Sequence, residues 1–477
     1  MPRTPRPSAR FGAALSGHHP NRPKHFYRFN DREHADSRRS VRSLRLRPDV
    51  FLAQTQPGFE GVAWDEIAGR VEAAPELSSL DSQQSCSTTA PYRLGGHDRV
   101  SRARELGRRN VPDRAGMTIF TVPRLEPLRL LRTCEDLFAV VGYHDGLTGE
   151  PDALERIAAV AREAPYVEQA LATRSRLMPG LRAGHRLRYR VIVRMAGEQQ
   201  YRRVDVARAI SRAIAERGDH SWRPSADEAD VEFWATLLHS KTLNQRPHPA
   251  SPAGDKDYWD GRGLSRGVSK PQAATPFSQH PANELILAIR LSDERMRQRD
   301  YKVAHVPGSL RPAVAAALAL LSRPLPEDVV LDPFCGAGTV LIERAHLGRY
   351  RTLIGCDHDA AALSAARENV GPRYKPLELH RWDATAIPLP DHSVSKIITN
   401  LPWGIRHGSH EANRQLYPRA LREFHRLLLP GGRIVILTSE TRLMSDLITR
   451  GLFRPDRIQR VSILGVSAAL YLSSVQH

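Results

Sequence analysis

The sequence contains little cysteine and no long apolar run. Its four cysteines, Cys86, Cys134, Cys335 and Cys356, are scattered and form no Cys-x-x-Cys pair, so the sequence predicts neither a zinc site nor a disulfide framework. We therefore expect no metal, and this cysteine usage fits a reducing compartment, the cytoplasm. No apolar run reaches the roughly 18–20 residues that a membrane-spanning helix requires. The start of the chain also lacks the apolar segment of a secretory signal.

Acidic residues are scarce relative to basic ones. The chain has 70 Lys and Arg against 52 Asp and Glu, which gives a net charge of +18. Such an excess is typical of proteins that bind a polyanion, because each cation placed near a phosphate releases a counterion. Half of it lies in residues 1–48, which hold twelve Lys or Arg and three Asp or Glu. Because this stretch is rich in proline and lacks hydrophobic periodicity, residues 1–49 are predicted to form a disordered basic tail.

The rest of the chain shows strand and helix patterns in alternation, which predicts an α/β fold. The pattern suggests two small N-terminal units, a linker and a larger C-terminal unit. Their predicted bounds are 50–145, with a loop insertion at 76–115, then 150–246, 247–283 and 284–477.

The C-terminal unit has the pattern of a parallel sheet wound by helices. Strands and helices alternate from about residue 311 to residue 450, which favours parallel strands joined by helical crossovers. Two further strands, Ile458–Leu464 and Ala468–Ser473, flank Gly465 and predict a final antiparallel hairpin. The sequence therefore predicts a seven-stranded, Rossmann-like sheet ending in that hairpin.

A glycine-containing turn follows the first strand of this sheet. Strand Val329–Asp332 runs into Pro333-Phe334-Cys335-Gly336-Ala337-Gly338-Thr339 and then a helix. Such a turn exposes amide N–H groups, and glycine lets a ligand approach the backbone. A dinucleotide site would need a third glycine where Leu341 stands, so the pyrophosphate fingerprint is absent.

Acidic residues follow the first three strands of the sheet. Asp332 suits a ligand with a cationic amino group, such as methionine, and Asp357 can accept from both hydroxyls of a ribose. Asp383 follows the third strand, around Leu377–His380, and can accept from an adenine amine. The set predicts a site for S-adenosylmethionine. Its flanking residues complete the predicted cofactor contacts, namely Pro333, Cys335, Gly336, Gly338, Thr339 and Ala384.

The fourth strand, Val394–Thr399, runs into Asn400-Leu401-Pro402-Trp403. The lone pair of an exocyclic amine is conjugated into its ring. Two acceptors, the Asn400 side-chain oxygen and the Leu401 carbonyl, can hold its N–H bonds and turn the lone pair toward a methyl group. Pro402 stiffens the turn, and Trp403 offers a face on which a base can stack. These four residues are the predicted catalytic set, and residues 399–407 contain no cysteine nucleophile.

These motifs resemble those of the THUMP-domain RNA guanosine-N2 methyltransferases, which are class I enzymes. The resemblance covers DPFCGAGTVLIERA (332–345), GCDHD (355–359), WDATAIPL (382–389) and NLPWGIRHG (400–408). Upstream, FLAQTQPGFEGVAWDEI resembles the start of the family's ferredoxin-like domain, and residues 150–246 resemble a THUMP domain. The segment from His305 to Pro312 resembles the one that encloses the cofactor, which adds Ser309 to the site. The chain departs from the family at Leu401, where a second proline is common, and at Trp403, where Tyr or Phe is common.

The resemblance implies a tRNA substrate that is gripped at its 3′ end and methylated on an acceptor-stem guanosine, with position 6 favoured. The arginine face of Leu187–Arg194 is the hypothesis for phosphate contacts. The predicted set is Arg188, Arg190, Arg202, Arg203 and Lys241. Alternative substrates are an rRNA guanosine, a DNA adenine or a protein glutamine. A non-catalytic RNA-binding or assembly factor is the remaining alternative, and the intact Asn400 and Pro402 argue against it.

Overall fold

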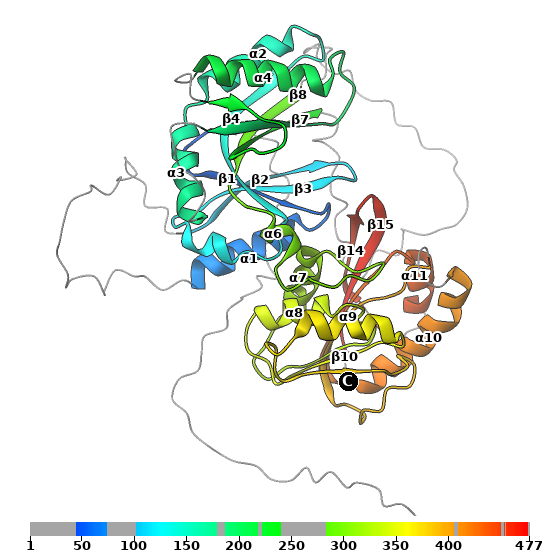
Figure 1. The fold of residues 1–477 in the computed structure, drawn as a ribbon. Helices are drawn as coiled ribbons and strands as arrows, with labels where there is room; N and C mark the ends of the chain where they lie inside the picture. Colours follow the sequence, from blue (N-terminus) through cyan, green and yellow to red (C-terminus); the bar gives the residue numbers. More distant parts are fainter. Residues whose placement is uncertain are drawn as a thin grey trace, which may run out of the picture.

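The computed structural model describes residues 44–73, 102–178, 187–217, 222–239, 283–404, 409–449, 453 and 455–475. Two mixed sheets organise this part of the chain, one in each half (Figure 1). None of the described helices combines the length and apolar character that a membrane crossing requires.

The N-terminal half is built on an eight-stranded sheet with the order β2-β3-β1-β4-β8-β7-β5-β6. Its pairs are antiparallel except for β5 with β6 and β5 with β7, which are parallel. In chain order the strands are β1 (Val50–Thr55), β2 (Arg104–Val111), β3 (Ala115–Thr121), β4 (Asp136–Leu147), β5 (Arg188–Met195), β6 (Arg223–Pro224), β7 (Val231–His239) and β8 (Asn283–Arg290).

Helices cover one face of this sheet. Their apolar residues join alternate strand residues, such as Phe51, Tyr189 and Phe233, in one core. In Figure 1, α2 and α4 lie side by side above the strands, with α3 along one side. The helices are α1 (Glu60–Ala73), the 3-10 turn η2 (Glu126–Leu130), α2 (Ala153–Glu163), α3 (Val167–Leu177) and α4 (Arg203–Arg217). The intervening strand residues, including Leu52, Phe138 and Trp234, form a separate cluster.

The structure of this half corrects four predictions. The two N-terminal units share one continuous sheet, because β8 pairs with β4 on one side and β7 on the other. The sequence places this strand in the C-terminal unit. Its central apolar residues, Leu285–Ile289, fit the middle of either sheet, and only strand pairing decides between the two. The predicted loop 76–115 contains β2 and the start of β3; β2 reads as polar because it is a charged edge strand. Of the predicted tail, residues 44–49 are described, and Leu44 is buried. Residues 1–43, 74–101 and 240–282 lie outside the described residues.

The C-terminal sheet confirms the predicted seven strands and final hairpin. Its order is β11-β10-β9-β12-β13-β15-β14, with parallel pairing from β11 to β13 and antiparallel pairing of β15 with both neighbours. The strands are β9 (Val329–Asp332), β10 (Thr352–Cys356), β11 (Leu377–His380), β12 (Val394–Asn400), β13 (Leu428–Thr438), β14 (Pro455–Ile463) and β15 (Val466–Ser474). The hairpin turns at Leu464 and Gly465, both with positive φ.

Helices cover both faces of this sheet. The apolar residues of α7 and α8 form one core with the strands, and those of α10 and α11 form another. The helix α7 is buried along its whole length. The helices are α6 (Arg295–Gln298), α7 (Pro312–Leu321), α8 (Thr339–His346), α9 (Ala360–Val370), α10 (His410–Leu427) and α11 (Thr441–Thr449).

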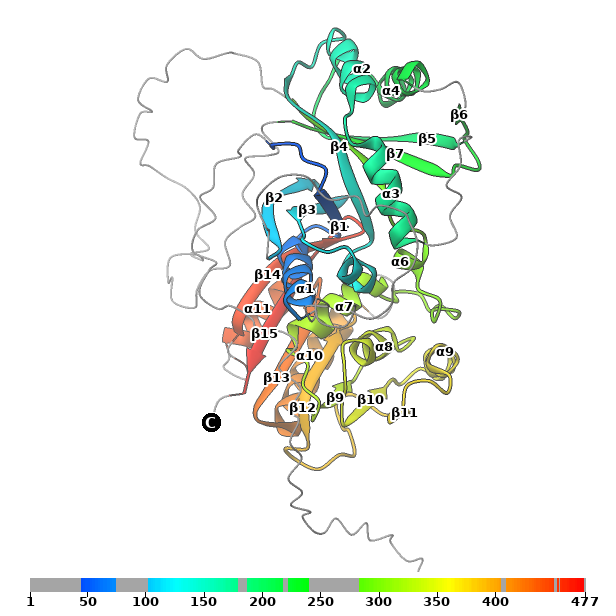
Figure 2. The ribbon, with the colours of Figure 1, turned by 90° about the vertical axis from the view of Figure 1, so that its left-hand side faces the viewer.

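The two halves meet where the β14–β15 hairpin reaches the turn between β1 and α1, as Figure 2 shows. The Ser462 N–H donates to the Pro57 carbonyl at 3.0 Å, and the Leu464 N–H donates to Gln56 Oε1 at 3.0 Å. Gly58 lies against this hairpin with a φ of +95°, and a Cβ there would lie 2.7 Å from the Arg460 carbonyl oxygen. The Pro57-Gly58 turn is therefore a docking surface for the C-terminal half.

A buried ion pair forms a second contact between the halves. Arg132, which precedes β4, donates to both carboxylate oxygens of Glu343 on α8, at 2.6 and 3.0 Å. The hydroxyl of Tyr301 also donates to Glu343, at 2.8 Å. The Glu343 side chain is fully buried, and a buried carboxylate requires such partners.

Gly58→Ala is expected to destabilise the protein more than the substitution of a glycine that has a positive φ but no close neighbour. A left-handed alanine costs about 1–2 kcal/mol, and the clash with the Arg460 carbonyl adds roughly 1–3 kcal/mol as overpacking does. Gly146→Ala is the matched control, since Gly146 has a φ of +82° and a Cβ added there would have no neighbour within 4 Å. Thermal unfolding of both variants measures the difference. Equal shifts in melting temperature would contradict the docking role of this turn.

Candidate active site

The glycine turn joins β9 to α8 with two residues in the left-handed region. Gly336 has a φ of +51° and Gly338, at the start of α8, a φ of +76°, conformations that any other residue adopts at a cost. The turn is also tied to the next strand, because the Cys335 N–H donates to the Cys356 carbonyl at 3.0 Å. Cys335 is buried, and burial raises the pKa of its thiol well above its usual value. Cys335 is therefore a packing residue of the turn, with an un-ionised thiol.

The first acid of the set, Asp332, ends β9 and is 1% exposed. Burial raises the pKa of this carboxyl, the Phe334 N–H that it accepts lowers it, and the nearby Asp357 raises it, so that the pKa lies at about 7. A buried carboxyl of this kind is ready to pair with a cation.

Asp357 follows β10 and braces the glycine turn. Its carboxylate accepts the Gly336 N–H at 2.9 Å and the Asp359 N–H at 3.0 Å. The third acid, Asp383, lies in an exposed loop after β11, next to the buried Ala384. The N–H and hydroxyl of Thr385 hold the pKa of Asp383 below its usual value. Because β9, β10 and β11 are parallel neighbours, the three acids lie at one edge of the sheet, as their positions in the sequence predict.

A residue that the sequence analysis missed connects this turn to the segment before α7. The Asn369 side chain on α9 is fully buried; its amide group donates to the carbonyls of Ala304 and Ala337, each at 3.0 Å. Its oxygen accepts the Ala304 N–H at 2.9 Å. Asn369 thus holds the segment containing Ser309 beside the glycine turn. A lone asparagine near the end of a helix gives no sequence signal for such a role.

Two buried hydroxyls face this region without a partner. Among the described residues, neither Ser309 Oγ nor Thr339 Oγ1 has a hydrogen-bond partner. Buried polar groups are normally paired, so these hydroxyls fit a site that takes a polar ligand. The described residues contain no group of three His, Cys, Asp or Glu side chains arranged to hold a metal.

The predicted catalytic loop begins at the end of β12. The Leu401 N–H donates to the Leu437 carbonyl of β13 at 3.0 Å, and the Leu401 side chain is buried. The indole N–H of Trp403 donates to Asn400 Oδ1 at 3.0 Å, a contact that the sequence analysis missed. Strand β12 is parallel to β9 and pairs with it, so Asn400 and Asp332 end neighbouring strands. Residues 405–408 lie outside the described part of the loop.

The predicted phosphate-binding residues are mostly engaged already. Arg188, Arg190 and Arg202 each form an ion pair with a nearby carboxylate. Arg203, at the start of α4, is exposed. Lys241 lies outside the described residues. Arg188 and Arg190 lie on β5, whereas Arg202 and Arg203 lie where α4 begins. Three of these four arginines have an internal partner.

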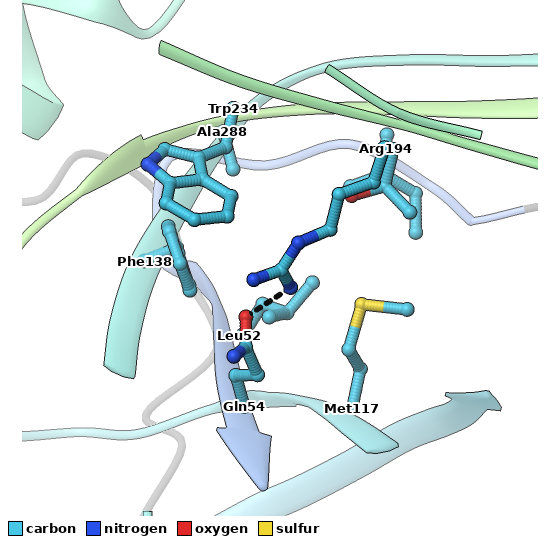
Figure 3. A pocket seen from close by; sticks show the side chains of 9 residues that line it. Leu52, Gln54, Met117, Phe138, Arg194, Trp234 and Ala288 are labelled. Atoms are coloured by element: carbon cyan, nitrogen blue, oxygen red, sulfur yellow. Dashed lines mark hydrogen bonds between the residues drawn. The ribbon is translucent and has the colours of Figure 1, made fainter. Parts of the chain in front are cut away.

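Arg194, farther along the same face of β5, is different. Its guanidinium lies 4.3 Å from the centre of the Trp234 ring and donates to Gln54 Oε1. Figure 3 shows it in a pocket also lined by Phe138 and Met117. Burial lowers the pKa of Arg194 to about 10, so it remains charged at neutral pH. Among the described residues it forms no ion pair.

Comparisons with known proteins bear on the fold and on the C-terminal half of the chain. Residues 299–468 match the family model described as RMKL-like, methyltransferase domain. The mouse tRNA (guanine(6)-N(2))-methyltransferase THUMP3 is 33% identical over 207 residues, which cover 40% of this chain and 41% of the relative. The Thermus thermophilus tRNA (guanine(6)-N2)-methyltransferase is 35% identical over 170 residues, covering 35% of this chain and 50% of the relative. The bovine U6 snRNA (guanine-N(2))-methyltransferase THUMPD2 is 37% identical over 134 residues, covering 28% of this chain and 26% of the relative.

The chain thus spans half or less of the length of these three curated relatives. Solved structures match it more fully. TrmN from Thermus thermophilus covers 89% of this chain and 99% of its own at a TM-score of 0.58 and 22% identity. SMU.472 in complex with SAH covers 90% of this chain and 98% of its own at a TM-score of 0.55 and 14% identity. These structures share the fold of both halves, and the family model matches the C-terminal half, over residues 299–468.

Proposed function

We propose that this protein transfers a methyl group from S-adenosylmethionine to the N2 amine of a guanosine in tRNA, in the acceptor stem and at position 6. The observation that carries the proposal is the Asn400–Trp403 loop at the end of β12, beside the strand that ends in Asp332. Relatives named as tRNA guanine-N2-methyltransferases support the choice of amine and of RNA. We place the reaction in the cytoplasm, as the cysteine usage suggests.

The residues at the sheet edge fit S-adenosylmethionine. Asp332 would pair with its amino group, Asp357 would accept from its ribose and Asp383 from its adenine. The unpartnered hydroxyls of Ser309 and Thr339 offer further polar contacts. The cofactor supplies a methyl group on a sulfonium, which is a good leaving group. The protein's own contribution is then largely one of positioning.

The catalytic loop would orient the amine. Asn400 Oδ1 and the Leu401 carbonyl each accept one N–H of the amine, which turns its lone pair toward the methyl group. A carbonyl oxygen has two acceptor lone pairs, so Asn400 can accept from the amine while it accepts the Trp403 indole N–H. The methylated amine carries a positive charge and then loses one proton to solvent from the side held by these oxygens. The Trp403 ring is the proposed stacking face for the guanine.

Methylation of total RNA lacking the modification tests the proposal. With labelled S-adenosylmethionine, N2-methylguanosine in the tRNA fraction is expected. Mapping of the modified nucleotide then tests whether it is at position 6. Methylation of small nuclear RNA instead would favour the U6 relatives, and methylation of rRNA would favour the rRNA alternative. In parallel assays, methylated adenine in DNA or methylated glutamine in protein would contradict an RNA substrate and favour the corresponding alternative. No product in any fraction would favour a binding or assembly role.

Asn400→Ala is expected to lower kcat by at least about 100-fold, as loss of a single positioning acceptor can. Cofactor and RNA affinities should change little, because the cofactor residues and the N-terminal sheet are untouched. Single-turnover methyl transfer, with separate binding measurements for cofactor and RNA, checks this. Loss of RNA binding with unchanged chemistry in bound complexes would contradict the assigned role.

Cofactor affinity is expected to depend on pH through Asp332. Its pKa of about 7 means that the carboxyl is largely neutral below pH 6 and charged above pH 8. A cationic amino group needs the charged form, and free α-amino groups lose their own proton near ~8. Affinity should therefore rise between pH 5.5 and about 7, peak between about 7 and 8, and fall beyond that. Calorimetric titration across this range measures it.

Asp332→Asn should bind the cofactor weakly and lose the rise in affinity on the acidic side. It should not destabilise the fold at pH 8, because a raised folded-state pKa means that ionisation of this buried group costs folding free energy. Asp383→Asn is the control, since the pKa of Asp383 is lowered and it stays charged over the range. It should weaken binding at every pH alike. Affinity of the wild type that is flat between pH 5.5 and 7 would contradict the role of Asp332.

Arg194 is the proposed phosphate contact on the N-terminal sheet. Its half-buried guanidinium lies over the Trp234 ring without an ion-paired carboxylate among the described residues, whereas Arg188 already pairs with Glu228 and Asp230. Arg194→Ala should weaken RNA binding and reduce the slope of log affinity against log salt by about 1, the loss of one phosphate contact. Arg188→Ala is the control and should change the slope less. A larger effect from Arg188→Ala would reverse the assignment.

A further inference from the structure

The catalytic loop is held from behind by the helix that follows it. The Pro402 carbonyl accepts two hydrogen bonds from α10, one from Asn413 Nδ2 at 2.9 Å and one from the Tyr417 hydroxyl at 2.6 Å. Asn413 is 1% exposed and Tyr417 fully buried. Two donors on one buried carbonyl fix its direction more firmly than a single bond can.

A second layer fixes these two donors. The Tyr417 hydroxyl lies 2.8 Å from Thr438 Oγ1, at the end of β13. The Asn413 amide also donates to Glu440 Oε1, at 2.9 Å. His410, at the start of α10, contacts the same Glu440 oxygen at 2.6 Å. The network therefore links the loop, the helix and the end of the neighbouring strand.

The loop passes close over this network. Gly404 has a φ of +69°, and a Cβ there would lie 2.9 Å from Glu440 Oε1 and 3.0 Å from Asn413 Nδ2. A side chain at position 404 would therefore separate the loop from its support, and this contact explains why glycine occupies that position.

The torsions of the loop show what the network controls. The ring of Pro402 fixes its φ, and the hydrogen bonds from Asn413 and Tyr417 fix its ψ by holding its carbonyl. On the other side, the Leu401 N–H is paired with Leu437 and the Leu401 side chain is buried. The peptide between Leu401 and Pro402 is thus restrained at both ends, and with it the Leu401 carbonyl.

We propose that Tyr417 and Asn413, supported by Glu440, are positioning residues for methyl transfer. They aim the Leu401 carbonyl at the amine and keep Trp403 in place beside Asn400. This inference rests on the proposed function, in which that carbonyl is one of two acceptors for the guanine amine. None of the three residues touches the substrate or the cofactor in this scheme, so they act through the loop alone.

Tyr417→Phe removes the hydroxyl and keeps the buried ring. We expect kcat for methyl transfer to fall about 10- to 100-fold, since misplacement of a reacting group by about 1 Å can have that effect. The KM for RNA and the Kd for S-adenosylmethionine should change less than about threefold, because neither binding site loses a contact. Steady-state and single-turnover kinetics, with calorimetry for the cofactor, give the separate values.

Tyr471→Phe is the matched control. Tyr471 is a buried tyrosine of β15 in the same domain, and its hydroxyl donates to the Thr441 carbonyl rather than to the Pro402 carbonyl. It should lower the melting temperature by a similar amount and leave kcat unchanged. An equal loss of kcat in both variants, or a loss that appears only in KM, would overturn the positioning role and leave a structural one.

Glu440 provides a second test that does not depend on tyrosine. Glu440→Ala should lower kcat, whereas Glu440→Gln keeps an oxygen that can accept the Asn413 amide and should recover most of it. Equal losses in the two variants would count against the network. Wild-type turnover in the same assay decides the proposed function by itself: an active wild type with a fully active Tyr417→Phe overturns only the positioning role. A wild type inactive on every RNA overturns both.

Discussion

Parallel strands of one sheet end at the same edge, and the candidate site depends on that constraint. Asp332, Asp357 and Asn400 follow three strands that are neighbours in the sheet, although up to 68 positions separate them in the chain. No single loop has to fold around the ligand, because each strand delivers its own residue to the edge. The sheet's apolar cores, one on each face, therefore hold the geometry of the site.

The same helix that starts at the glycine turn connects the site to the N-terminal half. The first residues of α8 line the turn, and Glu343, one turn further along, receives Arg132 from the other half. Removal of Glu343 would take away the carboxylate partner of Arg132, and removal of Arg132 would leave the buried Glu343 with Arg299 as its remaining cation, so either change weakens a buried pair at a cost. In the proposed function one half would hold the RNA and the other would modify it. This contact would then fix the distance that decides which nucleotide is reached.

The sequence was sufficient where local chemistry decides the structure. Strand β9, the turn with Gly336 and Gly338, and the final hairpin at Gly465 were all predicted, because short apolar runs and glycine turns carry their own signal. The sequence was insufficient where contacts between residues far apart in the chain decide the structure. The sequence of β8 does not show that it joins β4 to β7, and the roles of Asn369 and Tyr417 depend on carbonyls that folding brings close to them.

Trp403 shows how one substitution in a motif can change the mechanics of a site. Phenylalanine at this position could stack on a base but has no proton to donate, whereas the Trp403 indole both offers a ring and donates to Asn400 Oδ1. That bond occupies one acceptor position of the amide oxygen and restricts the rotation of the Asn400 side chain. The remaining acceptor position then has a defined direction. The other proposed acceptor, the Leu401 carbonyl, is restrained because α10 fixes the carbonyl of the next residue, Pro402. Both acceptors of the guanine amine are therefore oriented before any substrate arrives, and the reaction needs less rearrangement of the protein.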